Sequence, residues 1–145
     1  MNVILIFVWI WSAFIAMSFW ESSIESRNPW AKNSSGWKIK ITKNNSLTRY
    51  HFFIIVMWAF LLTLPLAIYG WDLKLFGVII SAYFSGIVIE DFFWFITNPK
   101  VKLKEFTTNF TNYYPWIKLG KRKIPTLYII SLAIAILSWG FIWRI

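Results

Sequence analysis

Apolar stretches alternate with polar ones four times along the chain. Each apolar stretch reaches the roughly 18–20 residues that an α-helix needs to cross a bilayer. They cover residues 3–20, 50–69, 75–97 and 126–143. The pattern therefore predicts a single all-α domain, residues 1–145, that forms an integral membrane bundle of four transmembrane helices. A secretory signal peptide is an alternative for the first stretch. A signal peptide requires Lys or Arg before its apolar region, however, and none precedes this stretch.

Two long polar segments, residues 21–49 and 98–125, connect the predicted spans, whereas residues 70–74 form only a short turn. The short turn makes the second and third spans antiparallel neighbours. Apolar and basic residues alternate with period two in Trp37–Thr42 and again in Val101–Lys104. Such alternation favours a short, half-buried strand, and it also fits an extended segment that lies on lipid headgroups.

Basic residues are distributed unevenly between the two ends of the predicted spans. Segment 21–49 carries six Lys or Arg and segment 98–125 carries seven, whereas the short turn has only Lys74. The positive-inside rule assigns both basic segments to the cytoplasmic side of the membrane. With four spans, both termini then lie on the non-cytoplasmic side.

The composition agrees with a membrane protein and excludes several kinds of chemistry. Hydrophobic residues make up 58% of the chain and charged residues 14%, against about 25% charged in soluble domains. There are 11 Trp, which concentrate at membrane–water interfaces, and no Cys, which excludes disulfides and thiolate metal sites. The net charge of +9 indicates contact with anionic lipid headgroups rather than nucleic acid, because no nucleic-acid motif accompanies it. The predicted headgroup contacts are Lys38, Lys40, Lys118, Lys121, Arg122 and Lys123.

A polar constellation gathers at the predicted cytoplasmic end of the bundle. It comprises Glu21, Glu25, His51, Glu90, Asp91 and Asn98. Glu90 and Asp91 lie inside the third span, about 10 Å from its end at a rise of about 1.5 Å per residue. Glu90 continues a face of small residues, so we expect it to point into the bundle. Asp91 is turned about 100° away from it.

Charged side chains at membrane depth are costly, by about 2.5–3.5 kcal/mol each on insertion scales, and three explanations for the constellation stay open. No cofactor is predicted outright, but the first explanation is a divalent metal held by Glu21, Glu25, His51 and Glu90. The second is a proton-linked or ligand site in which Glu90 or Asp91 is neutral. The third is structural, with Arg27 or Arg49 pairing with the acids and fixing the helix packing.

Two tryptophans stand beside acidic residues of this constellation. Trp94 lies four residues after Glu90, and Trp20 directly precedes Glu21. Such pairs fit a pocket that holds a cationic ligand by cation–π contact. The commoner use of Trp near the end of a span is that of an interfacial anchor.

Several motifs resemble those of a family of small, poorly characterised prokaryotic membrane proteins. They read W-E-x3-E at Trp20–Glu25, Y-H at residues 50–51 and E-D-F-x-W-F-x-x-N-P at Glu90–Pro99. Pro29-Trp30-Ala31 and Ile124-Pro125 with Tyr128 also belong to the match. The family pattern has Gly-Leu after Asn-Pro and Trp-His before the last span, where this chain has Val101-Lys102 and Tyr114-Pro115-Trp116. The resemblance implies a multi-pass, four-span protein of the prokaryotic plasma membrane and carries no known activity.

The sequence favours an accessory or structural subunit of a larger membrane complex, because the chain is small and has no enzyme motif. Its expected partners are the lipid bilayer and other membrane-protein subunits. One alternative is a membrane-embedded enzyme or a lipid- or cation-binding protein that uses the acidic constellation. Another alternative is a small proton-coupled carrier.

Overall fold

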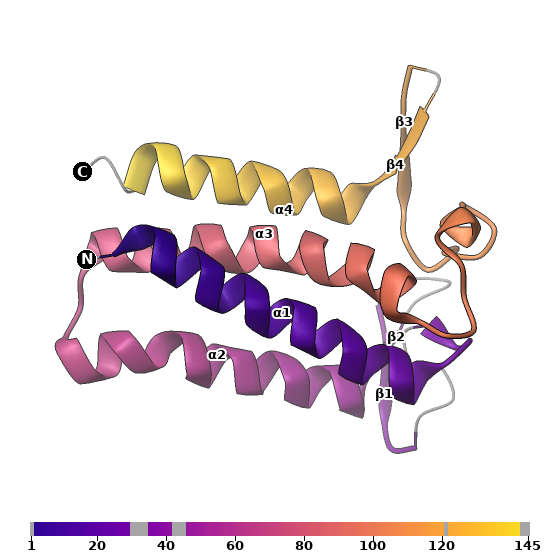
Figure 1. The fold of residues 1–145 in the computed structure, drawn as a ribbon, viewed down its shortest axis with the longest axis horizontal. Helices are drawn as coiled ribbons and strands as arrows, with labels where there is room; N and C mark the ends of the chain where they lie inside the picture. Colours follow the sequence, from indigo (N-terminus) through magenta and orange to yellow (C-terminus); the bar gives the residue numbers. More distant parts are fainter. Residues whose placement is uncertain (1, 30–34, 42–45, 121, 143–145) are drawn as a thin grey trace.

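The fold is mostly helical in the computed structural model, which describes residues 2–29, 35–41, 46–120 and 122–142 (Figure 1). The helices of the described part are α1 (Val3–Glu25), α2 (Arg49–Tyr69), α3 (Leu73–Thr97), the 3₁₀-helix η2 (Leu103–Glu105), α4 (Thr126–Leu137) and the π-helix η3 (Ser138–Ile142). The strands are β1 (Lys38–Lys40), β2 (Ser46–Thr48), β3 (Trp116–Leu119) and β4 (Arg122–Pro125).

All four predicted spans are helical, but they differ in length. α1, α2 and α3 are each long and apolar enough to cross a membrane. The apolar helix at residues 126–140 is shorter, so the structure supports three membrane-length helices and leaves the fourth span a prediction. α1 continues past the apolar stretch to Glu25, and α2 continues through Pro65.

The all-α prediction is confirmed in part: the described chain is mostly helical, and two short β-hairpins lie between its helices. β1 pairs antiparallel with β2, and Ile39 lies opposite Leu47. β1 is the strand that the alternation from Trp37 favoured. β3 pairs antiparallel with β4 in a hairpin that the sequence pattern did not reveal. The alternation at Val101–Lys104 does not form a strand in the structure. Instead, the Glu105 carboxylate accepts a hydrogen bond from the Lys102 N–H at 3.1 Å, which closes the tight turn of η2.

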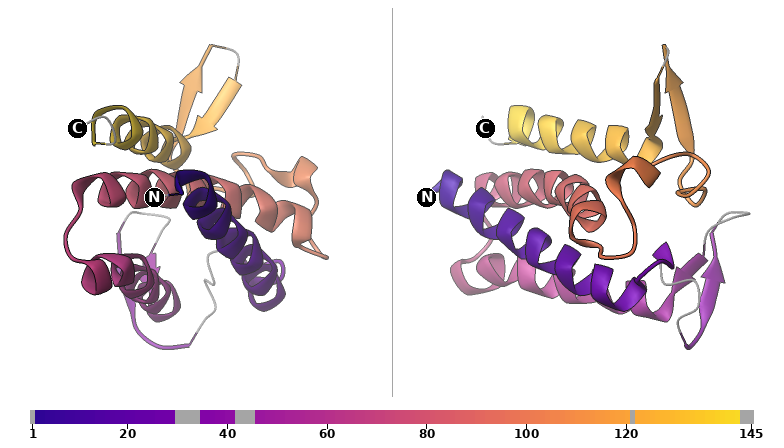
Figure 2. Two further views of the ribbon diagram at one scale, coloured as in Figure 1. Left: turned by 60° about the vertical axis from the view of Figure 1, so that its left-hand side comes forward. Right: turned by 45° about the vertical axis from the view of Figure 1, so that its right-hand side comes forward.

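Helix α3 is central in the bundle. α1 and α4 pack directly on α3, and α2 lies on the side away from α4 (Figures 1 and 2). The start of α1, the α2–α3 turn and η3 lie at one end, and both hairpins lie at the other (Figure 1). Both long polar segments are therefore at the same end of the bundle.

The half of the α1–α3 contact farther from the hairpins is tightly packed, and we call it the closed half. The Phe14 ring stacks on Trp58 of α2, with centroids 4.4 Å apart and 7° between the planes. Gly86 lies directly under Phe14, and a Cβ atom at this position would overlap the ring. Trp11 donates its indole N–H across the interface to the Ser85 hydroxyl at 2.9 Å. Close approach of the backbones at small residues is the usual way in which helices pack in lipid.

Candidate functional site

The hairpin end of α1 carries two acidic residues that point into the bundle. Glu21 and Glu25 are one turn apart and buried, with 8% and 6% of their surface exposed. Ser18 and Ser22 belong to the same buried face, and their hydroxyls donate to backbone carbonyls one turn back. Because α1 remains helical to Glu25, it carries both carboxylates inward rather than releasing them into the polar segment.

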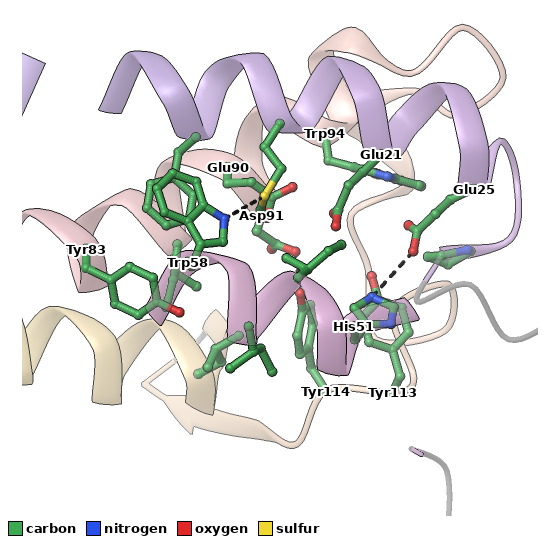
Figure 3. A pocket seen from close by; sticks show the side chains of 17 residues that line it. Glu21, Glu25, His51, Trp58, Tyr83, Glu90, Asp91, Trp94, Tyr113 and Tyr114 are labelled. Carbon is green, nitrogen blue, oxygen red and sulfur yellow. Dashed lines mark hydrogen bonds and ion pairs between the residues drawn. The ribbon is translucent and has the colours of Figure 1, made fainter. Parts of the chain in front are cut away.

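His51 lies in the first turn of α2 and faces Glu25. Thr48 caps the helix by accepting a hydrogen bond from the His51 backbone N–H, and its hydroxyl lies 2.8 Å from His51 Nδ1. His51 Nε2 lies 3.6 Å from Glu25 Oε1 (Figure 3). When the Thr48 hydroxyl donates to Nδ1, the hydrogen of the neutral ring is on Nε2 and points towards the carboxylate. The helix cap therefore orients the imidazole towards the acid on α1.

Glu90 and Asp91 leave α3 on different faces and have different partners. The Glu90 carboxyl lies within hydrogen-bonding range of the Glu21 carboxyl on α1. Asp91 instead accepts the hydroxyl hydrogens of Tyr114 and Tyr128, one on each carboxylate oxygen. Asp91 therefore ties α3 to α4 and to the segment before β3, whereas Glu90 faces another acid.

The segment from Asn98 to β3 is anchored at two places near the end of α1. The Asn98 Nδ2 donates to the Ser26 carbonyl at 2.6 Å, and its Oδ1 accepts from the Val101 N–H at 3.1 Å. Arg27 pairs with Glu105 at 2.6 Å. Arg27, a predicted partner of the acidic constellation, is therefore bound to a carboxylate of this segment instead. Asn98 fixes the segment and is not part of the cavity wall described below.

Two tyrosines of this segment close the site from the hairpin end. Tyr113 and Tyr114 are both buried and line the same cavity as the acids. Burial raises the pKa of both phenols well above the ordinary value, and the Asp91 carboxylate raises the pKa of each further. Both side chains therefore stay neutral, and Tyr114 keeps its hydrogen for Asp91.

These elements enclose a cavity of about 260 Å³, which we call the acidic cavity (Figure 3). Its polar part is lined by Glu21, Glu25, His51, Glu90, Asp91, Trp94, Tyr113 and Tyr114. Its apolar part is lined by Phe14, Met17, Pro29, Ile54, Ile55, Trp58, Tyr83, Ile87 and Leu127. Glu90 and Asp91 are only half-buried, which is consistent with side chains that face this empty space. The structure thus brings together five of the six predicted constellation residues.

The predicted cationic residues lie elsewhere. Arg49 lines a second, open pocket with Trp20 and Tyr50, outside the acidic cavity. The predicted headgroup-contact residues lie on the hairpins and are exposed: Lys38 and Lys40 on β1, Lys118 on β3, and Arg122 and Lys123 on β4. Lys121, also predicted, lies outside the described residues.

The acidic residues do not form a recognisable metal centre. Among the residues that the structure describes, no three His, Asp or Glu side chains are grouped closely enough to hold a metal ion. Glu21, Glu25, His51 and Glu90 share one cavity, but not in a ligating arrangement. The divalent metal therefore stays a prediction that this geometry does not support.

Sequence reasoning missed Tyr113, Tyr114 and Tyr128 as residues of the site. Tyr113 and Tyr114 fall in a stretch rich in aromatic residues, where nothing in the spacing separates a cavity wall from an interfacial anchor. Tyr128 belongs only to the family resemblance, with Ile124-Pro125, and the sequence predicted no role in a site for it. No family model, curated protein or solved structure matches this chain.

Proposed function

We propose that this chain is a multi-pass membrane protein that binds an amphiphilic ligand with a positively charged end in the acidic cavity. Large apolar side chains on the outer faces of the long helices support the membrane setting, for example Trp9 and Phe60, each 75% exposed. Such surfaces are unfavourable in water and suit a lipid environment. The exposed basic hairpins favour a cytoplasmic position for their end of the bundle in a prokaryotic plasma membrane.

The observation that carries the proposal is the charge of the cavity wall. The chain has 15 Lys and Arg and only six Asp and Glu, yet four of those six acids line this one cavity. None of the described residues that line it is Lys or Arg. Two carboxyl groups in contact, such as Glu21 and Glu90, repel each other unless a proton or another cation lies between them. A cationic group on a ligand meets this requirement.

The distribution of polar and apolar residues in the cavity wall indicates that the ligand also has an apolar part. The four acids, Tyr113 and Tyr114 line the hairpin side, whereas Phe14, Trp58 and Ile87 line the side towards the middle of the helices. A polar head thus meets the carboxylates while a hydrocarbon chain lies against aromatic rings. Aromatic faces also attract cations, which favours a positively charged head over a neutral one. Binding here requires no catalytic step.

The role of an accessory subunit stays a prediction, and it would use the outer surface of the bundle to contact other subunits. It does not conflict with ligand binding, because a subunit of a complex can hold a lipid. The carrier alternative would use the same cavity and requires a second opening to it.

A comparison of ligands of equal chain length tests the proposal. The protein is purified in a non-ionic maltoside detergent, and its thermal unfolding is followed with dodecylamine, dodecanol or dodecanoate. Dodecylamine is expected to stabilise the folded protein by about 2.7 kcal/mol at 100 times its dissociation constant. The neutral and anionic ligands should have little effect.

Variants connect the effect to the cavity. The triple change Glu21→Gln, Glu25→Gln and Glu90→Gln should abolish stabilisation by dodecylamine. Glu105→Gln serves as the matched control, because Glu105 pairs with Arg27 outside the cavity. Equal stabilisation by the amine and the carboxylate, or an undiminished amine effect in the triple variant, would refute the proposal.

A further inference from the structure

The β3–β4 hairpin has one aliphatic and one basic face. Side chains alternate between the two faces of a strand, and residues directly opposite each other on paired strands share a face. The register therefore places three aliphatic side chains on one face, which we call the aliphatic face: Ile117, Leu119 and Ile124. Lys118 and Lys123 lie opposite each other on the other face, which we call the basic face. The hairpin is thus amphipathic.

The aliphatic face is largely uncovered by the residues that the structure describes. Leu119 is 63% exposed, Ile117 is 43% exposed, and Ile124 is partly exposed. β3 and β4 pair with each other as a two-stranded sheet. An isolated two-stranded hairpin is marginally stable in water and gains stability when one face packs on another surface. We therefore expect a surface outside the described chain to cover the aliphatic face.

The hairpin runs across the bundle and adjoins the start of α4. The long helices run horizontally in Figure 1, where the hairpin stands upright, and it remains upright in the right-hand view of Figure 2. The Thr126 N–H donates to the Pro115 carbonyl at 2.8 Å, which fixes the base of the hairpin to the first turn of α4. In a bundle whose helices cross a bilayer, a hairpin in this position lies along the membrane surface.

Trp116 fixes one side of the hairpin to the segment that follows α3. It shares the basic face, because it lies opposite Pro125, two residues after Lys123. Its ring packs on Phe106, with centroids 5.4 Å apart, and its indole N–H donates to the Thr111 carbonyl at 3.1 Å. The side chains of the aliphatic face point the opposite way from Trp116. The aliphatic face is therefore turned away from this segment.

The basic residues of the hairpin define the kind of surface that fits it. Lys118, Arg122 and Lys123 are exposed, and none of them pairs with an acid in the part of the chain that the structure describes. Arg122 lies opposite Leu119, so a guanidinium borders the aliphatic face near the tip. The cytoplasmic leaflet carries anionic lipids that attract Lys and Arg. Long basic side chains reach headgroups while neighbouring apolar groups enter the acyl boundary, as in other amphipathic membrane-surface segments.

We propose that the β3–β4 hairpin is a binding surface for anionic phospholipids. The aliphatic face enters the outermost part of the acyl layer, and three basic side chains contact the lipid phosphates: Lys118, Arg122 and Lys123. This inference rests on the membrane setting of the proposed function. It does not depend on the cationic ligand, because the hairpin does not line the acidic cavity.

Spin labels on the two faces test this orientation. The chain contains no Cys, so Leu119→Cys and Lys118→Cys each give a single labelling position, on the aliphatic and the basic face respectively. Each labelled protein is reconstituted into phosphatidylcholine nanodiscs with or without phosphatidylglycerol. Collision rates of the label with oxygen, which concentrates in the bilayer, and with a water-soluble nickel chelate are then measured.

The expected result depends on the face and on the lipid. With phosphatidylglycerol, the label at position 119 should collide mainly with oxygen, whereas the label at position 118 should collide mainly with nickel. Without phosphatidylglycerol, the label at position 119 should become accessible to nickel, because the attraction between the basic residues and the lipid is lost.

Removal of two cations tests the role of charge. The changes Arg122→Gln and Lys123→Gln are introduced together into the Leu119→Cys protein. Each Lys or Arg near an anionic surface changes a binding equilibrium about fivefold, so the pair should shift the hairpin from bilayer to water by roughly 25-fold. Lys74→Gln is the matched control, because Lys74 lies at the other end of the bundle. Thermal unfolding in detergent shows that each variant is folded, and the comparison of the two lipid mixtures needs no charge variant.

The outcomes separate this inference from the proposed function. A label at position 119 that collides mainly with nickel in both bilayers refutes lipid binding and leaves the aliphatic face for a protein partner. Equal collision rates with and without phosphatidylglycerol, or no change on removal of the two cations, contradict the role of anionic lipid. More oxygen collisions at position 118 than at position 119 overturn the assignment of the faces. Dodecylamine binding should be the same in all these variants, so its failure would refute only the proposed function.

Discussion

The α1–α3 interface is packed in one half and hollow in the other. In the closed half, Phe14 covers Gly86 and stacks on Trp58, and the Trp11–Ser85 hydrogen bond crosses the interface. One to two turns further along the same two helices, the carboxyl groups of Glu21 and Glu90 meet in the wall of an open cavity. In a bundle built only for stability, the tight packing of the closed half would continue along the whole interface.

Under the proposed function, the closed half stabilises this pair of helices and the hollow half binds the ligand. The closed half holds the helices together, and the hollow half carries the acidic groups that line the cavity. Functional sites commonly break the local rules of stability, and the rest of the fold offsets the loss. Asp91 lies at the boundary, because it lines the cavity but has both oxygens occupied by tyrosines.

The largest effect is expected from filling the closed half. In Gly86→Ala the new Cβ would overlap the Phe14 ring, which is itself held by Trp58. The helices must then separate, and we expect a loss of about 1–3 kcal/mol of unfolding free energy, measured by thermal unfolding in detergent. Gly140→Ala is the control, because a Cβ there meets nothing within 4 Å. Equal stability of the two variants would contradict the tight packing of this half.

The next effect concerns the boundary residue Asp91. Tyr128→Phe removes one of its two hydrogen bonds and leaves a carboxylate oxygen without its donor. Hydrogen bonds to charged groups contribute about 1.5–3 kcal/mol, so the variant should unfold at a clearly lower temperature. Tyr69→Phe, at an 84% exposed position, should not change the unfolding temperature. If the two variants behaved alike, Asp91 would belong with the ligand-binding acids.

The hollow half should respond in the opposite direction. Glu90→Gln replaces a carboxyl group that faces Glu21 with a neutral amide of the same shape. We expect the protein without ligand to gain about 0.5–2 kcal/mol of stability, the usual range for relieving a functional site, while amine binding weakens. Thermal unfolding with and without dodecylamine measures both quantities. A loss as large as that of Tyr128→Phe would show that Glu90 is a packing residue.

The smallest effect is expected outside both halves, at the Arg27–Glu105 pair. The hydrogen bond from the Arg27 guanidinium lowers the pKa of Glu105 below the ordinary 4.5. The pair therefore stabilises the fold fully above about pH 4.5, and this contribution declines as the pH falls through the lower folded-state pKa. The difference in unfolding temperature between the unchanged protein and Glu105→Gln should shrink from neutral to acid pH. It should also shrink at high salt, and a constant difference would contradict an ionic role.

Much of the fold could be read from the sequence because bilayer length and hydrophobic runs impose it directly. The runs predicted the positions of all four main helices, and the polar segments predicted that Glu21, Glu25, His51 and Glu90 gather at one end. The second hairpin could not be predicted, because β3 and β4 lack strict alternation and form through pairing with each other. Arg27 was expected near the acids, and a loop that returns to the end of α1 brings Glu105 to it instead.

By itself the sequence determined which segments are helical and which end of the bundle is acidic, since both follow from the order of apolar and charged residues. Only the tertiary structure decided the partners of each acid. Asp91 reaches tyrosines 23 and 37 residues away, and Glu90 meets Glu21 instead. Those pairings depend on how α1 and α4 cross α3 and on the path of the segment after Asn98. Among the described residues, the same geometry leaves the Trp94 indole N–H without a hydrogen-bond acceptor, which no pattern of residues along the chain can reveal.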